Sequence, residues 1–333
     1  MNPLAPWQQR PYDHAAEALD AGRLPHALLF SGPEGIGKRR VAERLARRLL
    51  CPARISPADA CGECRSCRLF DSRHQLDAPE TRPDGRLAHP DGHPAHPDVR
   101  FVGFEWNTKV RPPRMRTEIV VDQIRAMNEK LSLTPQYGEH LVALLEPADA
   151  LNHNAANALL KTLEEPQPGR FIWLVSAHPT RLPATIRSRT QVLDFRLPAR
   201  EEALAWLVSS GHAPALAEEA LRVAGGHPGL ADRWLAEGVL PLRREVAEGL
   251  SGLRPQSVAA LAQQWAADDR LELRLAFAAD VALESARGAS PARARALARW
   301  FDHANRTRAL QRTTVRMDLA VVELLLAWCA LPA

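Results

Sequence analysis

Short apolar runs alternate with helical apolar patterns over the first 200 or so residues of the chain. Continuous apolar runs at 27–30, 141–145 and 171–175 are typical of strands buried on both faces of a parallel sheet. Between them, apolar residues recur every three or four positions, as they do on one face of a helix. This alternation predicts an α/β domain with a mostly parallel sheet over residues 1–198.

Further elements are predicted around these runs. Helices are expected over 38–50, 122–131 and 155–163, and the last of them is ended by Pro166. A further strand is expected over 99–104. The order strand, loop, helix at the start of the chain is the local pattern of a nucleotide-binding α/β fold.

From about residue 199 onward the chain shows helical periodicity and no strand pattern. Breaks at 225–229 and at Pro241 divide this region into a small helical domain over 199–241 and a helical C-terminal domain over 242–333. The length of 333 residues fits two or three domains at about 150 residues each. We therefore expect one α/β domain followed by two helical ones.

Composition and charge exclude several classes of protein. Hydrophobic residues make up 46% and charged residues 25%, which excludes a disordered, collagen-like or small disulfide-rich chain. A net charge of +4 is too balanced for a protein that coats nucleic acid by bulk charge. The chain has no apolar stretch at its start and no uncharged apolar run of 18 residues, so we expect a soluble, cytoplasmic protein with reduced thiols.

Residues 71–98 form an insertion of unusual composition. They are rich in His, Pro, Asp and Gly, which favours a disordered-like surface loop over a packed segment. A metal-binding tract made by His74, His89, His93 and His96 is the less favoured alternative, because prolines break any regular ligand spacing.

A phosphate-binding loop follows the first predicted strand. Residues 32–38, with Gly32, Gly35, Gly37 and Lys38, match the pattern G-x-x-x-x-G-K between a strand and a helix. Backbone N–H groups of such a loop hold phosphates, and its lysine reaches the outer ones. The loop is therefore a candidate ATP or ADP site.

Two parts of a hydrolytic site are absent. Arg39 stands after the loop lysine, where a Ser or Thr hydroxyl would bind Mg²⁺. After the run at 141–145, Glu146 can act as the metal carboxylate, but Pro147 stands where a second carboxylate would polarise water. We therefore predict no ATP hydrolysis by the isolated chain. Nucleotide binding without hydrolysis, and an empty loop kept as scaffold, are both left open by the sequence.

Four of the five cysteines lie close together in the sequence. They are Cys51, Cys61, Cys64 and Cys67. Four thiols within 17 residues suit tetrahedral Zn²⁺, which indicates a structural zinc module over 51–67. An iron–sulfur cluster is the nearest alternative, because C-x₂-C-x₂-C also begins some ferredoxin motifs. Cys329 falls in the apolar C-terminal segment and is interpreted as a core residue.

Three motifs resemble those of the clamp-loader branch of the AAA+ family. They are LPHALLF at 24–30, NALLKTLEEP at 157–166 and LPATIRSR at 182–189. The four-cysteine insertion after the loop helix resembles that of bacterial DNA polymerase III subunits. The degenerate loop and short C-terminal region resemble the delta-prime branch more closely than gamma/tau. The specific motifs cover residues 22–198.

This resemblance implies a subunit that takes part in DNA replication without hydrolysing ATP. Its AAA+ domain would carry the zinc module, its small helical domain would be a lid, and its C-terminal domain would join an oligomeric collar. The implied partners are gamma/tau ATPase subunits and the delta subunit, with the sliding clamp and primed DNA reached through the complex. The alternative is a catalytically active gamma/tau-type ATPase.

The resemblance also assigns a catalytic residue. Arg189 in Ser188-Arg189-Thr190 matches the arginine that such subunits offer in trans to a neighbouring ATP site, although the family usually has Cys at the third position. Guanidinium suits this role because it is always charged and grips phosphate oxygens bidentately. Active members also carry two positions that sense phosphate. Here the first, within 226–229, has no arginine, and the second is Ser176, a weak substitute.

Overall fold

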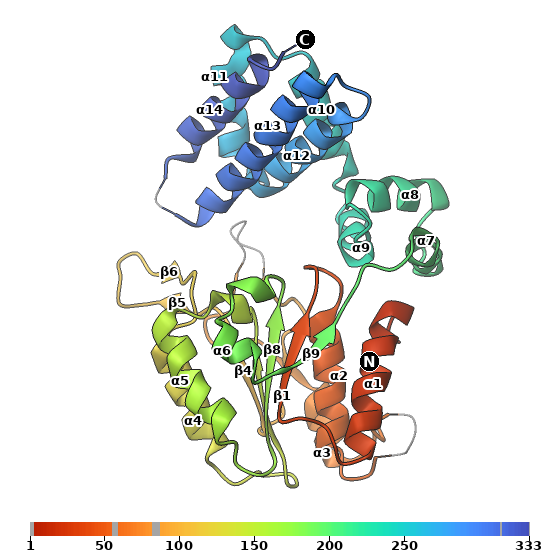
Figure 1. The fold of residues 1–333 in the computed structure, drawn as a ribbon, viewed down its shortest axis with the longest axis vertical. Helices are drawn as coiled ribbons and strands as arrows, with labels where there is room; N and C mark the ends of the chain where they lie inside the picture. Colours follow the sequence, from red (N-terminus) through yellow and green to blue (C-terminus); the bar gives the residue numbers. More distant parts are fainter. Residues whose placement is uncertain (1–2, 55–58, 82–86, 314, 333) are drawn as a thin grey trace. The chain divides into compact units, whose positions relative to one another are not determined.

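The computed structural model describes residues 3–54, 59–81, 87–313 and 315–332. These residues group into two compact units (Figure 1). The first contains the described residues up to 210 together with 226–230. The second contains 211–225 and the residues from 231 to the C-terminal end.

A five-stranded parallel sheet forms the centre of the first unit. Its strands, in spatial order, are β4 (Val99–Val102), β7 (Leu141–Leu145), β8 (Arg170–Ser176), β1 (Ala27–Ser31) and β9 (Gln191–Asp194). Phe30 of β1 lies opposite Val175 of β8 on one side and Leu193 of β9 on the other. Because every neighbouring pair is parallel, the structure confirms the predicted sheet.

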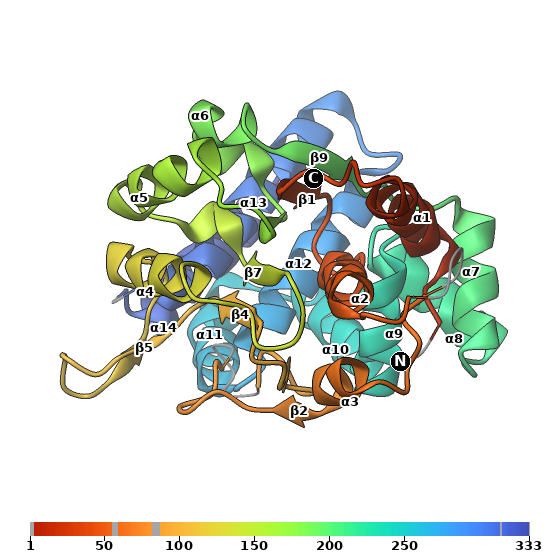
Figure 2. The ribbon, with the colours of Figure 1, turned by 90° about the horizontal axis from the view of Figure 1, so that it is seen from below.

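Helices cover both faces of this sheet. The helices of the first unit are α1 (Pro6–Asp20), α2 (Lys38–Leu50), α3 (Arg65–Asp71), α4 (Val121–Leu131), α5 (His153–Glu164), α6 (Ala184–Arg187) and α7 (Arg200–Ser209). Phe30 and Trp173 share one core with α1 and α2, while Leu29 and Leu174 share the other with α4 and α5. This is the alternation of side chains along a strand. Helices α4 and α5 lie side by side in two views (Figure 1, Figure 2).

The predicted element boundaries agree with the structure to within one or two residues. The helix over 38–50 has the predicted bounds. Helix α5 begins two residues earlier than expected because the side chain of Asn152 accepts a hydrogen bond from the Ala155 N–H at 2.9 Å and caps it. Strand β4 ends at Val102, two residues early, where its partner β7 ends at Leu145.

The insertion at 71–98 is packed in part, and this corrects the prediction of a disordered-like surface loop. Its short strands β2 (Arg73–His74) and β3 (His93–Pro94) pair antiparallel. His93 is 4% exposed and His96 is 2% exposed, so both rings are buried. Residues 82–86 lie outside the described residues. Among the residues described, the four histidines do not form a metal-ligating group.

Small elements complete the first unit. They are β5 (Trp106–Asn107), β6 (Arg114–Met115) and the 3₁₀ turns η1 (Ala148–Ala150) and η2 (Pro179–Arg181). Strands β5 and β6 form an antiparallel pair apart from the main sheet.

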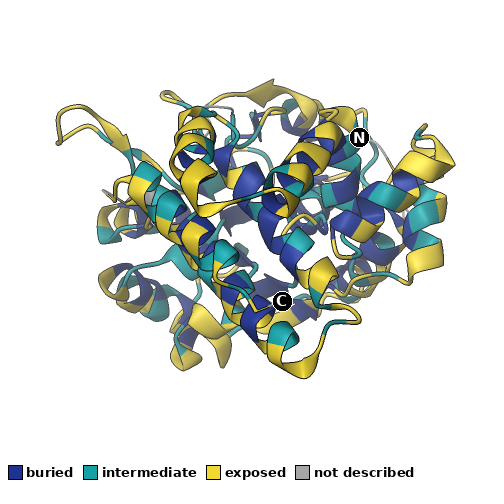
Figure 3. Cartoon of the chain, turned by 90° about the horizontal axis from the view of Figure 1, so that it is seen from above, coloured by how far each residue is buried: buried dark blue, intermediate teal, exposed yellow. Residues whose placement is uncertain are grey.

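The second unit consists of helices over its described residues. The helices and 3₁₀ turns from 214 onward are α8 (Pro214–Val223), α9 (Pro228–Ala236), α10 (Leu240–Ser251), η3 (Pro255–Ser257), α11 (Val258–Ala267), α12 (Leu271–Ala286), α13 (Pro291–Ala309), η4 (Leu310–Arg312) and α14 (Met317–Cys329). Trp300 and Trp328 pack edge to face at 4.7 Å between α13 and α14. Helices of the chain carry buried and exposed faces, as amphipathic sequences require (Figure 3). The predicted boundary at 241 between lid and C-terminal domain stays a prediction.

No helix in the described part of the chain is long and apolar enough to cross a bilayer.

Burial of His93 generates a prediction about acid sensitivity. Burial is the main cause that lowers the pKa of His93 to about 3, and the nearby Arg39 guanidinium adds to it. In the unfolded chain His93 binds a proton below about pH 6.5, whereas in the folded chain it does so only near pH 3. The contribution of His93 to stability should therefore be constant above pH 6.5 and fall below it, by up to about 1.4 kcal/mol per pH unit.

Urea unfolding at pH 7 and pH 5 measures this effect. His93→Asn keeps an acceptor near the position of Nδ1 and removes the titration, so the loss between the two pH values should shrink by up to about 2 kcal/mol. His153→Asn, at an exposed position, is the matched control and should keep the wild-type loss. An unchanged loss in His93→Asn would contradict the assignment.

Candidate functional sites

The phosphate loop lies between β1 and α2, as its sequence predicts. Gly37 is the N-cap of α2 with φ 96°, and a Cβ there would lie 2.1 Å from Nε2 of Gln8. The left-handed backbone therefore favours glycine here, and the Gln8 side chain of α1 occupies the space where a Cβ would lie. The loop thus leads directly into a helix N-terminus, the geometry that suits phosphate.

The loop carbonyl groups are bound by the protein's own side chains. Lys38 Nζ donates to the carbonyl oxygens of Gly32 and Pro33, each at 2.7 Å. Trp7 Nε1 and Gln8 Nε2 donate to the carbonyl oxygen of Ile36 at 3.2 and 3.1 Å. Lys38 is 6% exposed, and this burial lowers the pKa of its ammonium. The predicted phosphate-binding lysine is therefore satisfied inside the loop.

Residues 226–230 lie against the same loop. A Cβ on Gly229 would lie 2.0 Å from the carbonyl oxygen of Gly35, so only glycine allows this approach. Nδ1 of His227 lies 3.1 Å from the carbonyl oxygen of Glu34, which can only accept, so Nδ1 carries the proton. Burial lowers the pKa of His227. Residues 226–229, where the sequence has no arginine, therefore contact the loop through the backbone at Gly229 and the imidazole of His227.

Arg39 and Glu146, which the sequence places at two metal-binding positions, form an ion pair. Nη1 of Arg39 lies 3.2 Å from Oε2 of Glu146, and Nε lies 2.8 Å from Oε1 of Glu43. Pro147 follows Glu146 and offers no carboxylate, as predicted. The metal carboxylate is therefore neutralised by a guanidinium.

Ser176, the predicted sensor substitute, is bound to a carboxylate that sequence reasoning did not single out. Its Oγ donates to Oδ1 of Asp149 at 2.6 Å, and the N–H of Ala177 donates to the same oxygen at 3.2 Å. Asp149 lies three residues after Glu146, and this short offset from the end of β7 is the signal that could have identified it.

Arg189 lies just after α6 with its side chain 37% exposed. Its Nη2 lies 2.7 Å from Oε1 of Glu164, and its Nη1 donates to the carbonyl oxygen of Thr185 at 3.0 Å. Glu164 belongs to the NALLKTLEEP motif, so the structure brings two of the predicted motifs together at one surface position. Arg187, two residues earlier, is also exposed.

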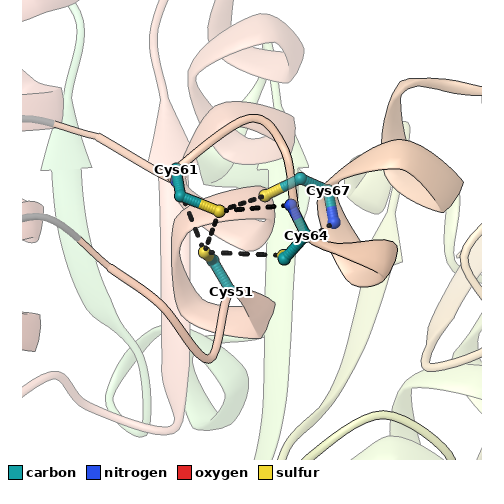
Figure 4. Close-up of side chains that lie close together, drawn as sticks. All are labelled: Cys51, Cys61, Cys64 and Cys67. Atoms are coloured by element: carbon teal, nitrogen blue, oxygen red, sulfur yellow. Dashed lines mark hydrogen bonds between the residues drawn. The ribbon is translucent and has the colours of Figure 1, made fainter.

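The four clustered cysteines converge in space as their spacing predicts. Their Sγ atoms all lie within 4.8 Å of one another (Figure 4). The Cys51 sulfur lies 3.5 Å from that of Cys61 and 3.9 Å from that of Cys64, and the sulfurs of Cys61 and Cys67 are 4.0 Å apart. A tetrahedral ion with bonds of ~2.3 Å requires sulfur separations of about 3.8 Å, which these values fit.

Backbone N–H groups support the cluster. The Cys64 N–H lies 3.4 Å from the Cys61 sulfur, and the Cys67 N–H lies 3.4 Å from the Cys64 sulfur. Donation from Cys64 is the main cause that lowers the pKa of Cys61 to about 6, whereas burial raises the pKa of Cys51 and Cys67. Cys329 lies apart in α14, half-buried, with its sulfur 3.9 Å from the carbonyl oxygen of Leu253.

A buried histidine ties this module to the α/β domain. Ser66 donates through Oγ to the carbonyl oxygen of Leu50 at 2.8 Å, so Nε2–H of His96 donates to that hydroxyl, also at 2.8 Å. Nδ1 of His96 accepts from the N–H of Asp98 at 3.1 Å. Burial lowers the pKa of His96, in keeping with this neutral form. The cysteine module is thus anchored through the insertion.

Comparisons with known proteins agree with the motifs. The profile of a family described as DNA polymerase III, delta subunit, matches residues 7–199. The chain is 38% identical to DNA polymerase III subunit delta-prime of Pseudomonas aeruginosa over 269 residues, which cover 80% of this chain and 72% of that protein. It is 32% identical to the subunit delta-prime of Haemophilus influenzae, over 73% of this chain and 65% of that protein.

More distant similarities extend to other proteins. The tau subunit of Escherichia coli DNA polymerase III is 32% identical over 184 residues, 55% of this chain and 23% of that protein. A crystal structure of a DNA polymerase III gamma subunit-related protein from Thermotoga maritima has a TM-score of 0.48 at 15% identity, covering 95% of this chain and 99% of that one. The parallel sheet with its phosphate loop confirms the predicted α/β fold class with a P-loop. The chain belongs to the DNA polymerase III subunit delta-prime family.

Proposed function

We propose that this chain is a non-hydrolysing subunit of the bacterial clamp loader, which assembles with gamma/tau and delta to place the sliding clamp on primed DNA. The observation that carries the non-hydrolysing role is the ion pair between Arg39 and Glu146. A Mg²⁺ ion needs a hydroxyl and a carboxylate at these two positions. Neither position is left to bind one, and Pro147 cannot polarise water.

The alternative, an active gamma/tau-type ATPase, draws support from the similarity to tau subunits over 55% of the chain. The same contacts argue against it, because Lys38 is satisfied by loop carbonyl groups and Arg39 by carboxylates. In a gamma/tau-type site, these positions would have to bind phosphate and metal.

Turnover by the isolated chain separates the two functions. We expect no ATP hydrolysis above background with or without primed DNA, because no residue at these positions is left to bind the metal or to polarise the attacking water. Phosphate release measured with the purified chain checks this. DNA-stimulated turnover that Lys38→Ala abolishes would establish the active ATPase instead.

Arg189 is the residue that we propose acts on a partner's nucleotide. It is exposed, it is at the motif position of a trans-acting arginine, and its one carboxylate contact, with Glu164, is itself 49% exposed. Exposed ion pairs contribute little free energy, so this contact can be exchanged for phosphate oxygens at low cost. In the complex, the guanidinium would stabilise negative charge on the transferred phosphoryl group.

The reconstituted complex tests this role. Arg189→Ala should lower ATP turnover at the neighbouring site, on the order of 10³-fold or more if it acts as other arginine fingers do, and slow clamp loading. Arg187→Ala is the matched control and should keep the wild-type rates. Assembly of both variants is followed by size-exclusion chromatography. Unchanged turnover in an assembled Arg189→Ala complex would refute the assignment.

We further propose that the four cysteines hold one structural Zn²⁺. A closed set of four thiolates leaves no open position for a substrate, and the ion would fix a loop-rich module that has little core of its own. The sulfur separations fit such an ion. An iron–sulfur cluster is the second candidate for the same ligands.

Elemental analysis of the purified chain should find one zinc per chain. Cys64→Ser should lose the metal and destabilise the α/β domain, because a ligand is removed. Cys329→Ser, outside the cluster, should retain the full zinc content. Iron in place of zinc, or no metal in the wild-type chain, would overturn this proposal.

Location and domain roles follow from the same proposal. A cytoplasmic, nucleoid-associated replisome subunit would contact DNA mainly through the complex, in keeping with a net charge of only +4. We propose residues 199–241 as the lid and 242–333 as the collar domain, where helices α11 to α14 supply surfaces for packing between subunits.

A further inference from the structure

The guanidinium of Arg39 is enclosed on several sides. Besides Glu43 and Glu146, its Nη2 lies 2.9 Å from Nδ1 of His93, and its Nη1 lies 3.0 Å from both ring nitrogens of His89. The ring of Phe101 lies below it, 4.9 Å from the guanidinium carbon. The side chain is 18% exposed. All three guanidinium nitrogens therefore have acceptors within hydrogen-bond distance.

The acceptor role of His93 is fixed by its chemistry. Arginine can only donate, so the nitrogen that faces Nη2 must carry a lone pair. Burial keeps the pKa of His93 low, and the imidazole is therefore neutral at neutral pH. A neutral ring beside a guanidinium accepts a hydrogen bond without adding a second positive charge.

The insertion supplies these histidines in a fixed place. Strand β3, which carries His93, pairs with β2, and Arg73 of β2 donates to Oε2 of Glu43 at 2.8 Å. Glu43 thus holds Arg39 through one oxygen and the insertion through the other. Gly92 has φ 69°, and a Cβ there would lie 2.5 Å from the carbonyl oxygen of His74, so the tight pairing requires glycine.

His89 has a second partner within the insertion. Its Nε2 lies 3.6 Å from Oε2 of Glu80, whose side chain is 10% exposed. The backbone also closes this part of the insertion, because the N–H of Ala88 donates to the carbonyl oxygen of Glu80 at 2.9 Å. The part 87–98 therefore contacts Arg39 directly, and Glu80 in the other described part supports it through His89.

Arg39 and Glu146 come from the two sequence positions that hold a divalent metal in a phosphate-loop site. The position after the loop lysine provides a hydroxyl ligand, and the position after the next buried strand provides a carboxylate. In this chain a guanidinium starts from the first position and reaches the second at 3.2 Å. A divalent cation placed there would meet the positive charge of a guanidinium instead of a hydroxyl.

We propose that the described parts of the insertion, 71–81 and 87–98, form a clamp that holds Arg39 against Glu146 as a permanent internal cation, in the place of the divalent metal. His89 and His93 are its positioning residues, and Glu43 joins the clamp to helix α2. The clamp keeps Mg²⁺ out of the phosphate-loop site whatever nucleotide is present. This inference deepens the non-hydrolysing role proposed above.

Mn²⁺ binding by the zinc-loaded full chain tests the exclusion of metal. Electron paramagnetic resonance of free Mn²⁺, with ATP present, should show no Mn²⁺ bound to the wild-type chain beyond the ATP control. Arg39→Thr restores a hydroxyl ligand and should gain about one Mn²⁺ per chain. The double variant Arg39→Thr, Glu146→Gln should lose that Mn²⁺ again, which locates it at Glu146.

Two results would overturn the exclusion. One is Mn²⁺ bound by the wild-type chain and lost on Glu146→Gln, since the metal would then coexist with Arg39. The other is a folded Arg39→Thr chain that gains no Mn²⁺, since Arg39 would then not be what keeps the metal out. Thermal unfolding confirms that each variant is folded before its Mn²⁺ is counted.

Chemical labelling tests the clamp itself. Phenylglyoxal modifies accessible guanidinium groups, and mass spectrometry of peptides reports the rate at Arg39 alone. The pair of changes His89→Ala, His93→Ala should raise that rate by about tenfold or more, while His153→Ala should leave it unchanged. Equal rates in the two folded variants would show that the insertion does not hold Arg39. Neither measurement involves Arg189 or the assembled complex, so failure here is distinguishable from failure of the finger assignment.

Discussion

The parallel sheet brings residues that are far apart in sequence to one edge of the α/β domain. Because its strands run in the same direction, the ends of β1, β7 and β8 meet, and polar residues of the site lie at these ends or in the segments after them. Lys38 comes from the loop after β1, Glu146 from the end of β7 and Ser176 from the end of β8. This constraint holds whatever residues stand at those positions, so a change in chemistry leaves the architecture intact.

In a hydrolytic site, the groups at this edge would bind phosphate and metal; here they bind groups of the protein itself. Lys38, at the phosphate-binding position, donates to loop carbonyl groups. Arg39, at the metal-binding position, pairs with Glu43 and Glu146. A buried charge without a partner would be costly, so an arginine at this position needs carboxylates nearby. The insertion adds ring nitrogens of His89 and His93 to that set.

The sequence allowed the sheet, the helices that flank it and the cysteine cluster to be predicted, because each depends on local patterns. Apolar runs determine the buried strands, and the spacing of four thiols determines their convergence. The insertion could not be predicted from its composition. His93 is buried through contacts with Arg39 and Phe101, and none of these contacts is visible in a hydrophilic, proline-rich segment. Nor does Asp149 stand out until Ser176 is seen beside it.

Two arginines of this domain lie in contrasting environments, and the contrast bears on what each can do. Arg39 has acceptors at all three guanidinium nitrogens and is 18% exposed, so freeing it would break its ion pairs with Glu146 and Glu43. Arg189 has one carboxylate partner, and both side chains are more than a third exposed. Water can replace that contact at little cost in free energy. The same chemical group is therefore held by several contacts in one place, and in the other it keeps a single exposed carboxylate contact that can be exchanged at little cost.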